Sequence, residues 1–172
     1  ALQNVKNDKV LRLTMLFHDM GKPVMKTTDE NGRDHFKGHA IASEQIAKTV
    51  MKRLKFDNDT IRKVTKLVAY HDYRMEPTGA NVRRAMHEIG VELFPYYLAV
   101  RLADTKAQSS YERRGKLENI IQIRELYRNA LRNKECVTLK DLAVTGTDLI
   151  NLGIAPGKEL GTLLNELLDM VI

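Results

Sequence analysis

Residues 13–23 read LTMLFHDMGKP, a short run in which a histidine and an aspartate stand among apolar side chains. The apolar residues of this run recur at three- and four-residue steps, which is the spacing of one face of an α-helix. Gly21 and Pro23 then form a usual stop arrangement for a helix. The stretch therefore predicts a helix whose end carries His18 and Asp19 toward the protein interior.

The rest of the chain predicts an all-α fold. Only four prolines and ten glycines punctuate its 172 residues, and apolar residues follow helical rather than alternating steps. A polar loop with Asn31 and Gly32 at its turn is compatible with a short hairpin. We expect helices over residues 8–20, 38–55, 57–71, 81–89, 94–108 and 110–133, and short helices within residues 137–172. A more charged composition after Ser109 predicts a domain of residues 1–109 and a helical body and tail of residues 110–172.

Composition narrows the class of protein. The chain is 43% hydrophobic, and a domain of about 150 residues buries nearly 70% of its unfolded surface. Its single cysteine, Cys136, excludes an internal disulfide framework and fits a reducing compartment. Since no apolar run approaches the roughly 20 residues of a membrane span, we expect a cytoplasmic protein without a membrane partner. The formal net charge of +6 is compatible with a polyanionic partner.

Polar residues on the apolar faces of the predicted helices are the most informative feature. Besides the pair in the first helix, His39, His71 and Asp104 each share a face with an apolar stripe at spacings of three, four and seven. The stripes are Ala42, Ile46, Val50 and Leu54 for His39, Ile61, Val64 and Val68 for His71, and Leu93, Tyr97, Val100 and Ala107 for Asp104. Four helices thus each direct a histidine or an aspartate toward a common interior.

Two buried carboxylates beside three imidazoles need a partner for their charges. A divalent metal meets this need, because histidine nitrogen and carboxylate oxygen are its usual ligands. A single inward histidine is more often a satisfied core residue, and Asp19 could instead cap a helix or pair with an arginine. The coincidence on four helices favours the metal. We expect His87 to be solvated, since it lies off the apolar stripe of its helix, and His35 to lie in a loop near the mouth of the site.

Gly21 and Lys22 directly follow the histidine–aspartate pair. Glycine allows the backbone to approach a ligand, and lysine can place a positive charge beside the metal. Together they suit a phosphate, whose oxygens interact with both a Lewis acid and a cation. The alternative for Lys22 is a solvated residue that the helix dipole favours at a C-terminus.

These residues resemble a known family. Residues 16–23 (LFHDMGKP) resemble the signature of the HD-domain superfamily of metal-dependent phosphohydrolases. The spacing to His39, to His71-Asp72 and to residues 101–104 (RLAD) is similar to one branch, the region that follows the catalytic head in bacterial class II CCA-adding enzymes and poly(A) polymerases. Residues 139–150 (LKDLAVTGTDLI) and 153–161 (GIAPGKELG) resemble the end of the same tRNA nucleotidyltransferase family, so the likeness covers nearly the whole chain.

The resemblance implies an HD-domain helical bundle over residues 1–109. It implies a divalent metal (Mg, Mn, Ni or Fe) on His18, Asp19 and Asp104, with His39 and His71 as further ligands or phosphate contacts. The ligand set of the superfamily normally starts with a histidine one helix upstream, and residues 1–10 contain none. The family's nucleotidyltransferase head has no counterpart here, so we expect a fragment or a stand-alone relative that does not polymerise nucleotides.

Two functions follow as hypotheses. The first is a metal-dependent phosphohydrolase, either a 2′,3′-cyclic phosphodiesterase or a phosphatase, acting on nucleotides or RNA ends. Its expected catalytic residues are Asp19, Lys22, His39 and His71. The alternative is a non-catalytic RNA-binding module that holds tRNA for the absent head.

Lys22, Arg101 and Lys158 are the candidate contacts to phosphate or RNA. For the segment at Lys158, packing of the apolar face that follows it is the favoured alternative to phosphate binding at the helix N-terminus. The arginines of residues 113–132 could touch an RNA backbone, but such charges more often form a solvated helix face.

Overall fold

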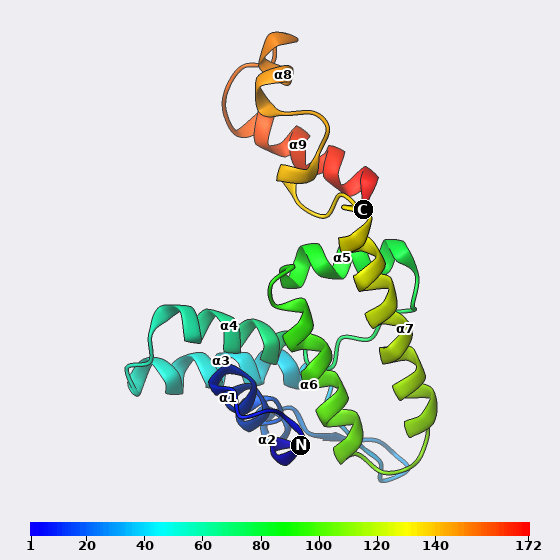
Figure 1. Ribbon diagram of the computed structural model, residues 1–172. Helices are drawn as coiled ribbons and strands as arrows, with labels where there is room; N and C mark the ends of the chain where they lie inside the picture. Colours follow the sequence, from blue (N-terminus) through cyan, green and yellow to red (C-terminus); the bar gives the residue numbers. More distant parts are fainter. The chain divides into compact units, whose positions relative to one another are not determined.

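The computed structural model describes all of residues 1–172, and they form two compact units. The first unit comprises residues 1–74 and 92–120, and the second comprises residues 75–91 and 121–172. The predicted all-α class is confirmed, because helices make up nearly all of the regular structure and only two strands of two residues accompany them (Figure 1). The domain boundary expected near Ser109 stays a prediction.

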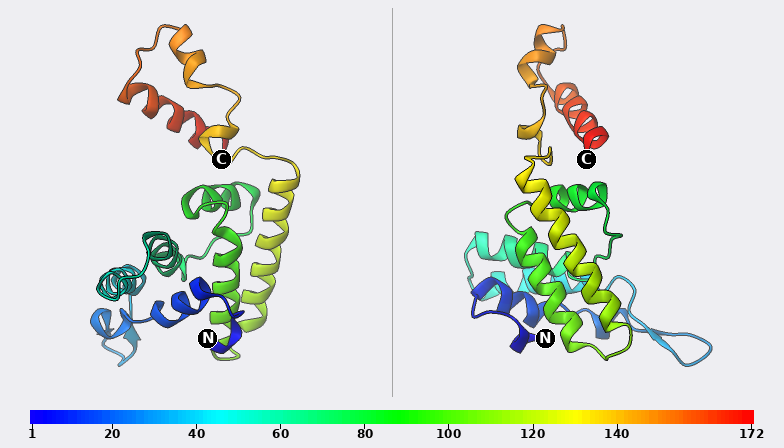
Figure 2. Two further views of the ribbon diagram at one scale, coloured as in Figure 1. Left: turned by 60° about the vertical axis from the view of Figure 1, so that its left-hand side comes forward. Right: turned by 45° about the vertical axis from the view of Figure 1, so that its right-hand side comes forward.

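The first unit holds most of the helices. Its elements are the short 3-10 helix η1 (Leu2–Asn4), α1 (Lys9–Phe17), α2 (Lys22–Met25), β1 (Thr27–Thr28), β2 (Asp34–His35), α3 (His39–Arg53), α4 (Asn58–Tyr70), α6 (Phe94–Ala107) and the start of α7 (Arg113–Arg132). The two strands pair antiparallel with Thr27 opposite His35. They form the short hairpin that the loop sequence suggested, and this hairpin extends away from the helices of the unit (Figure 2).

Local sequence explains where these helices begin. Asp8 and Asp57 precede α1 and α4, and their side chains accept hydrogen bonds from the N–H groups of Leu11 and Thr60. Such N-caps satisfy donors that have no partner within the helix. The first predicted helix ends at Phe17, and Pro23 lies in the first turn of α2, where its missing N–H costs nothing.

Two apolar clusters fix the position of α1. One cluster joins Phe17 of α1 to α3 and α4 through Ala47, Met51, Ile61, Val64 and Val68. The other joins Leu11 and Met15 of α1 to Val100 and Ala103 of α6. The predicted stripe of α4 is therefore buried as expected. Because α1 packs against helices on both sides, its C-terminal end lies where α3, α4 and α6 all contribute side chains.

The prediction for the apolar face of α3 is wrong, because the buried positions are each shifted by one residue. The helix buries Ser43, Ala47 and Met51, whereas Leu54 is 59% exposed. Gly21 explains the rotation, because its N–H donates to Ser43 Oγ at 2.8 Å and a Cβ at this position would lie 2.4 Å from the carbonyl oxygen of His39. His39 is four residues before Ser43 and remains on the buried face. The stripe of α6 likewise ends early, because Ala107 is exposed.

The second unit contains α5 (Gly79–Ile89), the rest of α7, the 3-10 helix η2 (Leu139–Asp141), α8 (Gly146–Asn151) and α9 (Lys158–Val171). Capping boxes begin η2 and α8, and α8 packs beside α9 (Figure 2). The apolar face of α9, which follows Lys158, was expected to be buried. Leu168 on this helix is fully buried while Val171 is 50% exposed, so the expected packing holds in part. None of the helices is both long enough and apolar enough to cross a membrane.

Candidate metal centre

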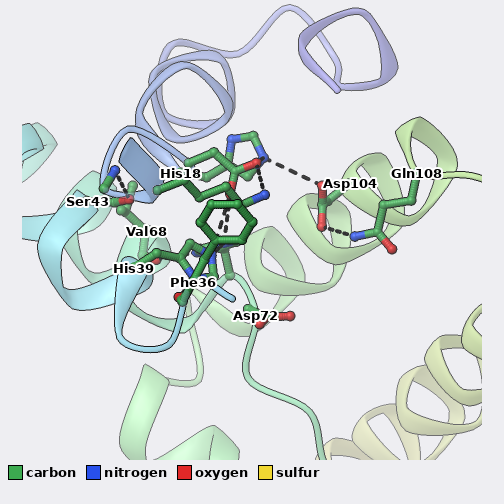
Figure 3. Close-up of polar contacts among 12 residues, drawn as sticks. His18, Phe36, His39, Ser43, Val68, Asp72, Asp104 and Gln108 are labelled. Carbon is green, nitrogen blue, oxygen red and sulfur yellow. Dashed lines mark hydrogen bonds and ion pairs between the residues drawn. The ribbon is translucent and has the colours of Figure 1, made fainter. Parts of the chain in front are cut away.

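The ends of three helices in the first unit bring its histidines together. His18 directly follows α1, His71 directly follows α4, and His39 is the first residue of α3. Asp19 lies in the turn before α2, and Asp104 lies on α6. The expected convergence of these five residues is observed, and Figure 3 shows His18, His39 and Asp104 among them.

A pocket of about 710 Å³ opens over this cluster. Asp19, Lys22, His39, His71 and Asp104 all line it. Its further lining includes His35, as expected. The expected loop position of His35 is wrong, because His35 belongs to β2 and pairs with Thr27 of β1. The His35 ring contacts Asp29 of the hairpin turn at 2.9 Å.

The same kind of hydrogen bond orients all three imidazole rings. The Nδ1 atoms of His18, His39 and His71 lie 2.9, 2.8 and 2.7 Å from the carbonyl oxygens of the residues three positions earlier. A carbonyl oxygen only accepts hydrogen bonds, so each Nδ1 carries a hydrogen. In the neutral ring the other nitrogen, Nε2, is then left with a free lone pair.

The lone pairs of His39 and His71 face each other, and all three Nε2 atoms face carboxylate oxygens. His39 Nε2 lies 3.1 Å from His71 Nε2, and Asp19 Oδ1 lies 3.5 and 3.6 Å from these two atoms. His18 Nε2 lies 3.3 Å from Asp19 Oδ2 and 3.5 Å from Asp104 Oδ1. Lone pairs this close repel unless a proton or a metal ion lies between them.

The donor set fits a divalent cation. Ligand atoms of Asp19, His39 and His71 all lie within 4.8 Å of one another. Imidazole nitrogen and carboxylate oxygen suit divalent transition metals, and the chemistry of this set is mixed in that way. The backbone carbonyls that hold Nδ1 also fix each ring orientation, which is a common support for histidine ligands.

Electrostatics keep both aspartates ionised. Burial raises the pKa of Asp19, but hydrogen bonds from His71 and Lys22 and the charge of His18 outweigh it and hold this pKa well below its usual range. Burial also raises the pKa of Asp104, and the hydrogen bond and charge of His18 bring it below the ordinary value. Burial lowers the pKa of His18, but Asp104 and Asp19 together raise it above its ordinary value. The cluster is thus a strong site for positive charge.

Lys22 lies beside the cluster as expected. Its Nζ donates to Asp19 Oδ2 at 2.7 Å and lies 5.9 Å above the ring of Phe36. Asp19 therefore pairs with a lysine, and this contact gives Lys22 a partner in the site. Its role toward phosphate stays a prediction.

The remaining candidates lie elsewhere. Arg101 is only 8% exposed and donates from Nη1 to the carbonyl oxygen of Tyr73 and to the hydroxyl of Tyr97, at 2.9 and 3.0 Å. Lys158 is an exposed first residue of α9 in the second unit. The expected phosphate contacts of Arg101 and Lys158 stay predictions. His87 is exposed, as predicted.

Gln108 was missed by the sequence analysis. Its side-chain amide donates to Asp104 Oδ2 at 2.7 Å, so Asp104 lies between His18 and Gln108 (Figure 3). The signal was available, because residues four apart on a helix are neighbours and glutamine–aspartate pairs interact at this spacing. The carbonyl groups that hold the histidines carry no signal of their own in a sequence.

Comparison with known proteins identifies a family to which the chain is similar. The family of tRNA nucleotidyltransferase domain 2 matches residues 38–172, which include His39, His71 and Asp104. The chain is 30% identical over 164 residues to the CC-adding tRNA nucleotidyltransferase of Thermus thermophilus, with 92% of this chain and 35% of that protein covered. It is 27% identical over 164 residues to the A-adding tRNA nucleotidyltransferase of Deinococcus radiodurans, with 94% of this chain and 37% of that protein covered.

The chain therefore spans little more than a third of the length of these relatives, at 35% and 37%. No solved structure gives a significant match.

Proposed function

This chain belongs to the family of tRNA nucleotidyltransferase domain 2, and we propose that its first unit is a metal-dependent phosphohydrolase of the HD-domain type. The proposed substrates are 2′,3′-cyclic phosphates or terminal phosphates of nucleotides and RNA ends. The proposed ligands of the divalent cation are His18, Asp19 and Asp104, together with His39 and His71.

The observation that carries this proposal is the approach of three Nε2 atoms, on rings fixed through Nδ1, to the carboxylate of Asp19. Without a cation, one proton would have to lie between His39 and His71 and a second between His18 and Asp104. A divalent cation held by Asp19, His39 and His71, whose ligand atoms lie within 4.8 Å of one another, would satisfy these atoms, with His18 and Asp104 beside it.

The bound metal and the residues of the pocket have different proposed roles in hydrolysis. A divalent metal, when bound, supplies Lewis acidity toward the phosphate ester and lowers the pKa of a water molecule. Lys22 holds a positive charge at the pocket wall, where it can neutralise a phosphate oxygen. His39 and His71 line the same wall, and either ring, where it does not ligate the cation, can position the ester or return a proton to its leaving oxygen.

Hydrolysis of 2′,3′-cyclic AMP by the purified chain tests this proposal. We expect activity with Mn²⁺, loss of activity with chelator, and loss of activity in Asp19→Ala. Asp148→Ala is the matched control, because Asp148 caps α8 in the second unit. Activity that survives chelator, or survives Asp19→Ala, would contradict the phosphohydrolase.

A second candidate function rests on the family match, which extends from residue 38 to residue 172 and so includes all of the second unit. We propose that the chain holds tRNA as a binding module of a nucleotidyltransferase, a role that also fits its net charge of +6 and a cytoplasmic location. This function and hydrolysis are compatible in one protein.

Binding of labelled tRNA, followed over a series of salt concentrations, distinguishes the two functions. Phosphate contacts make affinity fall as salt rises, whereas chelator and Asp19→Ala should leave tRNA binding intact. If Lys158 touches a phosphate, Lys158→Ala should reduce the slope of log affinity against log salt by about one. Absence of tRNA binding at low salt would remove this candidate.

A further inference from the structure

The two oxygens of Asp104 have different partners. Oδ1 faces His18 Nε2 at 3.5 Å, within the cluster proposed to bind the cation. Oδ2 accepts a hydrogen bond from Gln108 Nε2 at 2.7 Å. Gln108 lies one turn further along the chain, directly after the last residue of α6, and its side chain also lines the pocket. The carboxylate plane of Asp104 is therefore fixed from the side opposite to the histidine.

The start of α7 fixes the orientation of the Gln108 amide. Lys116 Nζ lies 3.0 Å from Gln108 Oε1, and an ammonium group has donors but no acceptor. The amide oxygen must therefore face Lys116, which leaves the amide N–H groups facing Asp104. Arg113 adds a second constraint, because its Nη2 donates to the backbone carbonyl oxygen of Gln108.

The two aspartates of the cluster are held by different chemistry. Asp19 Oδ2 accepts from the ammonium group of Lys22, which offsets its charge. Asp104 accepts from a neutral amide, which fixes its direction and leaves its negative charge intact. Of the two carboxylates, Asp104 thus presents its full charge to a cation in a partly buried site, where its side chain is 19% exposed.

From these contacts we propose that Gln108, oriented by Lys116, is a positioning residue that aims Asp104 at the cation. The inference rests on the proposed cation site, because Asp104 is one of its ligands. Hydrogen-bonded partners of a ligating carboxylate orient it, and their removal costs roughly 10- to 100-fold in metal affinity. Gln108 does not itself touch the substrate or the cation.

Calorimetric titration with Mn²⁺ tests the inference on the full chain. We expect Gln108→Ala to weaken Mn²⁺ binding roughly 10- to 100-fold, and Lys116→Met to weaken it by a smaller factor. Lys116→Arg keeps a donor for the amide oxygen and should restore the affinity of the unaltered protein. Arg114→Met is the matched control, since Arg114 pairs with Glu118 on the exposed side of α7. Melting temperatures in chelator should be the same for all five proteins, which separates positioning from a structural role.

The possible results are distinct. Equal Mn²⁺ affinity in the unaltered protein, Gln108→Ala and Lys116→Met would overturn the inference and leave the proposed function standing. A lower melting temperature in chelator that parallels the loss of affinity would also overturn it. Failure of the unaltered protein to bind Mn²⁺ would instead refute the cation site, and with it the inference. If Gln108→Ala does not fold, the Mn²⁺ affinities of Lys116→Met and Lys116→Arg test the inference instead. These two variants alter a half-exposed side chain, so we expect them to fold.

Discussion

The two units of the chain use histidine and aspartate in opposite ways. In the first unit, His18, His39 and His71 stand at helix ends and face Asp19 and Asp104, which come from other elements. Apart from the contact between the adjacent residues His18 and Asp19, these contacts join residues far apart in the sequence, and they bury ionisable groups. Burial of this kind is unfavourable unless a partner compensates the charges.

In the second unit the same residue types bond to backbone groups and to threonines rather than to one another. Asp141 and Asp148 close capping boxes with threonines three residues earlier. His87 is exposed, and its Nδ1 lies 3.0 Å from the carbonyl oxygen of Val137. These residues explain where short helices begin and how the unit is tied together.

A low carboxyl pKa does not by itself distinguish the two situations. The side-chain hydroxyl and backbone N–H of Thr145 hold the pKa of Asp148 below its usual range, and His71 and Lys22 do so for Asp19 against the effect of burial. The difference lies in where the partners come from. Asp19 faces His39 and His71 as well as Lys22, and such long-range convergence of ionisable groups indicates a site. Partners that all lie within three residues, as for Asp148, indicate a helix end.

The largest expected effect is on metal binding. Asp19→Ala removes the oxygen that faces both His39 and His71, and we expect Mn²⁺ affinity to fall by more than about 100-fold, beyond the loss of a supporting residue. Asp148→Ala should leave the affinity unchanged. Calorimetric titration of both variants measures this contrast directly.

Urea unfolding in chelator completes that test. Asp19→Ala should then be about as stable as the unaltered protein, because its partner Lys22 is 40% exposed and remains solvated. A loss of about 3–5 kcal/mol, typical of breaking a buried ion pair, would show that Asp19 is a structural residue and would contradict its role as a ligand.

A smaller effect is expected from two glycines. At Gly21 a Cβ would lie 2.4 Å from the carbonyl oxygen of His39 and 2.7 Å from the N–H nitrogen of Ser43, and backbone atoms cannot rotate away. Gly21→Ala should therefore lower the free energy of unfolding by about 1–3 kcal/mol. Gly161 of α9 has no atom within 4 Å of such a Cβ, so Gly161→Ala should raise it by up to about 1 kcal/mol. Urea melts that ranked the two variants in the reverse order would contradict the close packing of α2 on α3.

The smallest effect is a dependence of stability on pH. Asp104 and Asp19 outweigh burial and raise the pKa of His18 in the folded protein, so folding favours its protonated form. Its contribution to the free energy of unfolding is complete below the ordinary pKa of 6.5 and is lost as pH rises through the raised pKa. In chelator, stability should therefore decline over this range, and His18→Asn should flatten the decline. His87→Asn should keep it, and a decline unchanged in His18→Asn would assign the titration to another group.

Much of the fold and part of the site could be predicted from the sequence. Stripe periodicity placed His71 and Asp104 on inward faces, and the turn residues Asn31 and Gly32 marked the hairpin. These features depend on the spacing of neighbouring residues, which can be read directly from the sequence. His18 and Asp19 were found in the same way.

The rest depends on contacts between distant residues. The face that α3 buries depends on the close approach of Gly21. The spacing of apolar residues within α3 contains no sign of this contact. The orientation of Gln108 depends on Lys116, a residue of the next helix. The backbone carbonyls that hold the three imidazoles depend on helix-end geometry.

In the proposed metal centre, the imidazoles of His18, His39 and His71 are fixed through Nδ1 and direct Nε2 toward Asp19 and the cation. Long-range ¹H–¹⁵N spectra of the histidine rings test this arrangement most directly, first in chelator and then with substoichiometric Mn²⁺. We predict that His18, His39 and His71 carry hydrogen on Nδ1 at high pH, and that their Nε2 signals broaden first while those of His87 stay sharp. Equal broadening of His87, or no selective broadening of the three, would contradict the metal centre.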